Sequence, residues 1–161
     1  MKKRWAVLIL SLLVAGTAVM IYCFSAQSAA LSSDTSARVT RWLLQMLKRG
    51  FGDLSAREQQ ALISRYGPFV RKAAHFTEFF LLGLFLRLLL QWLRVRRKTA
   101  VSWALGALYA VTDELHQIAV GGRAAMARDV LIDSAGVLCG ALLALLCVYL
   151  AAKRARPKKE A

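Results

Sequence analysis

The chain has 161 residues, of which 58% are hydrophobic, and its formal net charge is +14. Average soluble domains carry fewer apolar residues and spread their charges more evenly. Most of the excess Lys and Arg stands in short runs beside apolar segments, a pattern typical of membrane topology. Nucleic-acid binding would need a basic groove with interleaved aromatic residues, which we do not find. The composition therefore excludes a nucleic-acid-binding domain and favours a single membrane domain over 1–161.

Four apolar stretches of about 18–21 residues remain between the charged runs, a length that matches a hydrocarbon core of roughly 30 Å. They predict transmembrane helices at about 5–24, 69–93, 99–118 and 130–150, with a basic tail over 151–161. The apolar core of the first stretch is longer than that of a signal peptide, so we interpret it as an uncleaved anchor. Arg87 interrupts the second stretch; its long stem is expected to reach the interface, and we assign it no function. The predicted fold is all-α and polytopic.

The segment 25–67 is the longest polar stretch and predicts an amphipathic helical insert on the extracytoplasmic side. Apolar residues recur at helical spacing within 36–49: Val39, Trp42, Leu43, Met46 and Leu47. This helix either lies on the membrane surface or packs over the helix bundle, and both alternatives remain open. Ser55 and Glu58 have capping-box spacing, which predicts a second short helix. We expect that helix to end at Gly67-Pro68 and the next to open at Pro68.

The orientation in the membrane is predicted from three basic runs that contain almost no acid. These are Lys2–Arg4, Arg94–Lys98 and Lys153–Lys159. Placing all three on the cytoplasmic side gives a multi-pass protein of the cytoplasmic membrane with both termini inside. The outer ends are then the end of the first crossing, the start of the second, the end of the third and the start of the fourth.

The unusual polar residues all fall at these outer ends. They are Ser25, Gln27, Lys72, His75, Glu78, Asp113, Glu114, His116, Gln117, Arg123, Arg128, Asp129 and Asp133. Charged groups that face lipid are costly, so we expect them to face the bundle interior or a wet cavity. An ion-pair network that only pins the helices together is the alternative to a functional site. The mixture of titratable types, including two histidines, favours a functional site. Gly136 and Gly140 continue the face of Asp129 and Asp133 and predict a close approach by another helix.

Two segments resemble the signatures of the VanZ-like family. The first signature is similar to residues 72–83, which include Lys72, His75, Glu78 and Gly83. The second signature resembles a set of later residues: Asp113-Glu114-Leu-His116-Gln117, Gly122-Arg123, Asp129 and Gly136. Asp133 stands where the family usually has Asn, and Ala119 and Gly121 replace an aromatic residue and a proline. The resemblance implies a small multi-helix membrane protein. The name-giving member is associated with resistance to teicoplanin, a glycopeptide that binds cell-wall precursors outside the membrane.

We therefore expect the protein to act at the outer leaflet on a membrane lipid or a lipid-linked envelope precursor; whether it is an enzyme stays open. The catalytic candidates, as acid, base or partner groups, are His75, Glu78, Asp113 and Glu114. The substrate-binding candidates are Lys72, Gln117, Arg123, Arg128, Asp129 and Asp133. We predict no cofactor and name no metal ligand, although His75, Glu78, Asp113, Glu114 and His116 could supply ligands.

Two other functional classes remain open. A small transporter or proton-relay protein would also place ionisable residues inside a membrane, but here they stay in the outer half. A non-catalytic module that binds an envelope component or scaffolds partners would use the same residues. The oligomeric state is left open.

Overall fold

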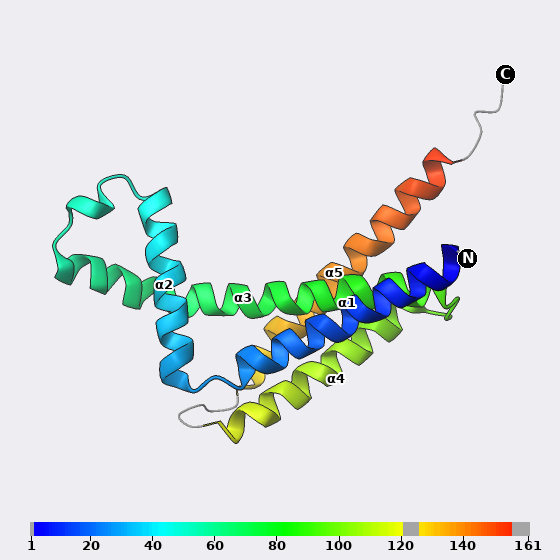
Figure 1. Ribbon diagram of the computed structural model, residues 1–161, viewed down its shortest axis with the longest axis horizontal. Helices are drawn as coiled ribbons and strands as arrows, with labels where there is room; N and C mark the ends of the chain where they lie inside the picture. The colour runs from blue at the N-terminus through cyan, green and yellow to red at the C-terminus, as the bar shows by residue number, and fades with distance from the viewer. Residues whose placement is uncertain (1, 121–125, 156–161) are drawn as a thin grey trace.

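The computed structural model describes residues 2–120 and 126–155, and every regular element in these two ranges is a helix. The elements are α1 (Lys2–Ser25), α2 (Ala29–Leu47), the short 3-10 helix η1 (Phe51–Asp53), α3 (Ala56–Trp92), α4 (Lys98–Ile118) and α5 (Ala127–Arg154). The predicted all-α fold class is confirmed. Figure 1 shows α1, α3, α4 and α5 gathered into one bundle, with α2 standing across α3 at its edge.

Three of the helices are long and apolar enough to cross a membrane: α1, α3 and α5. Large apolar side chains on α1 and α5 are exposed, as expected of a surface that lipid covers; they include Leu8, Ile9, Leu12, Leu138, Leu142 and Leu146. The helix α4 has 21 residues and carries Asp113 and Glu114 near its end. It is not one of the three helices above, so a fourth crossing stays a prediction.

The helix α3 is continuous over 37 residues and includes both the predicted short helix and the predicted second crossing. Its start is as predicted, because Ser55 and Glu58 form a capping box. The predicted break at Gly67-Pro68 is wrong: Pro68 lies inside the helix. An interior proline costs about 3 kcal/mol. We attribute the continuity to α2, which packs against this part of α3 and places Thr40 beside the buried Gly67. At 1.5 Å per residue, α3 is about 55 Å long and exceeds the hydrocarbon core.

Two glycines of α5 allow α3 to cross it at very short range. A Cβ built on Gly136 would lie 2.6 Å from the carbonyl oxygen of Phe76, and one built on Gly140 would overlap the carbonyl oxygen of Phe80. The close approach predicted at Gly136 and Gly140 is therefore confirmed, and α3 is the helix that approaches. This crossing places the polar middle part of α3 against the polar start of α5.

The helix α2 contacts α3 through small polar residues and not through its apolar face. Ser32, Ser36 and Thr40 are buried, whereas Trp42 is 55% exposed and Met46 is 67% exposed. Within the described residues, nothing covers the apolar face. The helix thus packs against the bundle through its polar side, and contact of its apolar face with the membrane surface stays a prediction.

Arg87 is buried between α3 and α4. Only 5% of it is exposed. Its Nε donates to Thr99 Oγ1 at 3.1 Å and its Nη1 donates to Gln91 Oε1 at 3.1 Å. Both acceptors lie beside the connection between α3 and α4, so the stem extends toward that end of the bundle. That it reaches the membrane interface stays a prediction.

The helix termini sort to two sides of the bundle (Figure 1). The N-terminus and the connection between α3 and α4 lie close together, and α5 ends on the same side. The ends of α1 and α4 and the start of α5 lie on the other side. The described parts of the three basic runs are thus on one side, as the predicted topology requires. Which side faces the cytoplasm stays a prediction.

Candidate functional site

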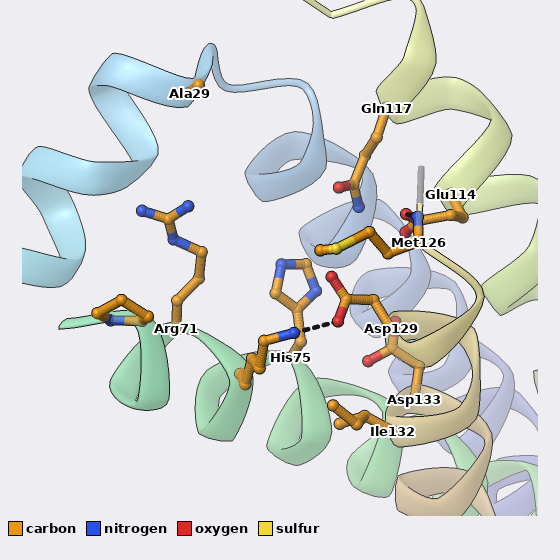
Figure 2. A pocket seen from close by; sticks show the side chains of 11 residues that line it. Ala29, Arg71, His75, Glu114, Gln117, Met126, Asp129, Ile132 and Asp133 are labelled. Atoms are coloured by element: carbon orange, nitrogen blue, oxygen red, sulfur yellow. Dashed lines mark hydrogen bonds and ion pairs between the residues drawn. The ribbon is translucent and has the colours of Figure 1, made fainter. Parts of the chain in front are cut away.

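A pocket of about 270 Å³ opens where the middle of α3, the end of α4 and the start of α5 meet the start of α2 (Figure 2). It is lined by Ala29, Pro68, Arg71, Lys72, His75, Glu114, Gln117, Met126, Asp129, Ile132 and Asp133. Most of the predicted site residues are in this lining, although they come from three helices. Two of these helices, α3 and α5, are brought together by their crossing at Gly136 and Gly140, next to the pocket.

The positive wall of the pocket comes from α3. Lys72 forms an ion pair with Asp129 of α5, marked by the dashed line in Figure 2. The Arg71 Nη2 donates to Ser33 Oγ at 2.7 Å, and its Nε donates to Ser36 Oγ at 3.4 Å. The helix α2 therefore holds the guanidinium beside the pocket. Arg71 was not among the predicted site residues, although its position next to Lys72 was a usable signal.

Asp113 is 5% exposed and is held from two helices. Ser25 Oγ donates to Asp113 Oδ2 at 2.8 Å, and Gln117 Nε2 donates to the same oxygen at 2.8 Å. Gln117 Nε2 also donates to Ser25 Oγ at 3.2 Å. This network joins α1 to α4 and fixes the orientation of the carboxylate. Ser25 was predicted at an outer helix end but not as a site residue. Its partner Asp113 is 88 positions away in the chain, so the contact could not be predicted locally.

Asp133 and Glu114 are also buried, at 3% and 6% exposed. Glu114 accepts a hydrogen bond from the backbone N–H of Met126, which ties the start of α5 to α4. Asp133 lines the pocket but receives no hydrogen bond from any described residue. A buried carboxylate without a donor is costly. Asp133 is therefore poised for a partner that enters the pocket.

Three of the predicted residues meet beside the pocket, one from each of three helices. One ring nitrogen of His75 and one carboxylate oxygen each of Asp113 and Asp133 all lie within 4.8 Å of one another. Figure 2 shows His75 and Asp133 pointing toward the same space between α3 and α5. These side chains therefore lie close together as predicted, whereas their chemical roles stay predictions. A nitrogen and two carboxylate oxygens can also hold a metal ion.

The remaining predicted residues are placed differently. Glu78 is half-buried one turn after His75, and its Oε2 is buried with no hydrogen-bond partner among the described residues. His116 stacks on Tyr22, with ring centroids 4.7 Å apart. Arg128 is exposed and does not line the pocket, so the structure does not bring it into the site. Arg123 lies outside the described residues.

The fold and the pocket together define a small helical membrane protein that gathers charged residues at one end of its bundle. A protein-family model described as VanZ/LLP1 matches residues 6–148, which is nearly the whole chain. The chain therefore belongs to the VanZ/LLP1 family, and the resemblance noted in its two signatures is confirmed. No curated protein and no solved structure matches the chain.

Proposed function

We propose that the protein binds the anionic head group of a membrane lipid or lipid-linked envelope precursor in this pocket, at the outer face of the cytoplasmic membrane, and acts on it. The observation that carries the proposal is the composition of the pocket. Arg71 and Lys72 of α3 supply positive charge, with His75 one turn further along the same helix, and the carboxylates in the lining come from α4 and α5. Family membership supports a link with teicoplanin resistance in general, because the name-giving member is associated with it.

The size and position of the pocket favour a head group over a whole lipid. A volume of about 270 Å³ lies at the lower end of small-molecule sites. It fits a phosphate with one small substituent, while acyl chains would stay in the bilayer beside the exposed apolar surfaces of α1 and α5. The exposed apolar face of α2 would hold the mouth of the pocket at the head-group level.

The charge arrangement suits a reaction at a phosphate ester. The Arg71 guanidinium matches the geometry of phosphate oxygens, and Lys72 adds a point charge. His75 would act as general acid or base, and Asp113, held by Ser25 and Gln117, would orient or stabilise its charged form. Glu78, the next acid along α3, is the alternative proton acceptor. Asp129 would neutralise Lys72 through their ion pair until an anionic head group enters the pocket and takes the place of Asp129 as the partner of Lys72.

A turnover assay tests this proposal. The full chain is reconstituted in vesicles made from a bacterial envelope lipid extract, and changed lipids are identified by mass spectrometry. Wild type is expected to convert one lipid class. His75→Gln and Glu78→Gln are each expected to slow conversion about 100-fold, the usual contribution of a positioned acid or base.

The matched control is Asp53→Asn, which removes an exposed acid remote from the pocket and is expected to leave conversion unchanged. Tight head-group binding without conversion would favour the binding module, and solute or proton flux would favour the transporter. Unchanged conversion in both His75→Gln and Glu78→Gln would contradict the assignment of the site. In cells, the teicoplanin susceptibility of wild type and of His75→Ala is compared at equal expression. Equal susceptibility of the two would contradict the link with resistance.

A further inference from the structure

We infer that His75, Asp113 and Asp133 form a binding site for one divalent metal cation, held between α3, α4 and α5. Each residue comes from a different helix, and their three donor atoms lie within 4.8 Å of one another. Two ligands about 2.1 Å from a common cation are about 3–4 Å apart. Small side-chain rotations would therefore bring the three donors to bonding distance without moving the helices.

Asp133 is the observation that separates this site from an ordinary polar cluster. Its carboxylate is 3% exposed, lines the pocket and receives no hydrogen bond from any described residue. Neither water nor a phosphate would supply positive charge to this carboxylate. A cation satisfies the group completely, because carboxylate oxygens are strong ligands for divalent metals.

The surrounding charges lead to the same conclusion. Asp133 interacts electrostatically with four other acids: Asp113, Asp129, Glu114 and Glu78. Lys72 forms an ion pair with Asp129. A divalent cation would offset the repulsion between Asp113 and Asp133, and Glu78, whose Oε2 is buried without a hydrogen-bond partner among the described residues, could approach as a fourth ligand.

The hydrogen bonds around Asp113 are arranged as they are around metal ligands. Ser25 and Gln117 both donate to Oδ2 of Asp113, so the second carboxylate oxygen can face a cation in a fixed orientation. Partners of this kind orient a ligand and raise its affinity for metal. They come from α1 and α4, so all four long helices of the bundle contribute to the site.

The donor set limits the choice of metal. One imidazole nitrogen with carboxylate oxygens suits Mn²⁺ or Zn²⁺, whereas Ca²⁺ and Mg²⁺ favour all-oxygen sites. With a cation bound, His75 would be a ligand and no longer the acid or base, and the cation, beside the pocket that Arg71 and Lys72 line, could polarise a phosphate oxygen instead. That use rests on the proposed function, but binding of the cation itself does not.

Metal binding is tested on the full chain in detergent, stripped with a chelator and titrated with MnCl₂ in the absence of lipid. Free Mn²⁺ is followed by electron paramagnetic resonance, and ZnCl₂ is then added as competitor. Wild type is expected to bind one Mn²⁺ per chain and to release it to Zn²⁺. Asp133→Asn and His75→Gln are expected to weaken binding roughly 100-fold, whereas Asp53→Asn is expected to match wild type.

Pulsed resonance on the wild-type complex makes the test independent of how the variants fold. Bound Mn²⁺ is expected to show coupling to a ¹⁴N nucleus, which the His75 ring supplies. Less than one bound ion per chain, bound Mn²⁺ without nitrogen coupling, or equal affinity in a folded Asp133→Asn would each overturn the site. The lipid-turnover assay without added metal reports separately on the proposed function, so the two can fail independently.

Discussion

Gly140→Leu is expected to prevent the bundle from assembling. A side chain at position 140 would overlap the carbonyl oxygen of Phe80, and the backbone N of Leu84 would lie 2.9 Å from its Cβ. Backbone atoms of a packed helix cannot rotate away as a side-chain tip can. We expect a loss of about 3 kcal/mol or more of unfolding free energy, measured by thermal unfolding of the purified protein and by its yield as a monodisperse species.

The matched control is Gly16→Leu on α1. Among the described residues, no atom outside the local helix lies within 4 Å of a Cβ at this position, and the residue is exposed. Its unfolding free energy is expected to stay within about 0.5 kcal/mol of wild type. Equal stability of Gly140→Leu and Gly16→Leu would show that α3 and α5 do not cross as described, and the pocket that rests on this crossing would be lost with it.

Reversing the charge of Lys72 is expected to have the second largest effect. Lys72→Glu removes the ion pair with Asp129 and adds a further negative charge to a group of acids that already contains Asp113 and Asp133. The pair is about two-thirds buried, so repulsion is only partly screened. We expect about 2–3 kcal/mol of lost stability, together with loss of anionic head-group binding to lipid vesicles.

The double variant Lys72→Glu with Asp129→Lys separates the two effects. It restores opposite charges across α3 and α5, so thermal stability is expected to recover by more than half. Head-group binding is expected to recover less, because the positive charge now projects from α5. Additive effects of the two single substitutions would mean that the two side chains do not interact, contrary to the structure.

Much of this architecture could be predicted because the membrane imposes strong rules on a sequence. The lengths of the apolar stretches, the capping box at Ser55 and the small residues Gly136 and Gly140 each reflect local physical chemistry. The cost of a lipid-facing charge led to the expectation that polar residues of different helices would meet. His75, Asp113 and Asp133 do meet, although they are distant in the chain.

The parts that were not predicted depend on tertiary contacts. The sequence around Pro68 alone indicates a helix boundary. In the structure α3 continues through Pro68, and α2 packs against α3. The acceptors of Arg87 could not be predicted either, because Thr99 is supplied by a different helix, α4. Arg128 is the exception, because its exposed position could have been predicted: it directly precedes Asp129 and therefore lies about 100° around the helix from the face that Asp129 and Asp133 share.

The central claim is that polar residues of separate helices converge at one end of the bundle, and cysteine crosslinking in native membranes tests it most directly. Cys23, Cys139 and Cys147 are free and are first replaced by Ala. The pair His75→Cys and Asp133→Cys is then compared with the pair His75→Cys and Tyr149→Cys, whose second site lies about 24 Å further along α5. A short bifunctional thiol reagent is expected to join the first pair efficiently and the second hardly at all, as peptide mass spectrometry would show. Equal crosslinking of both pairs, or none of the first, would contradict the account.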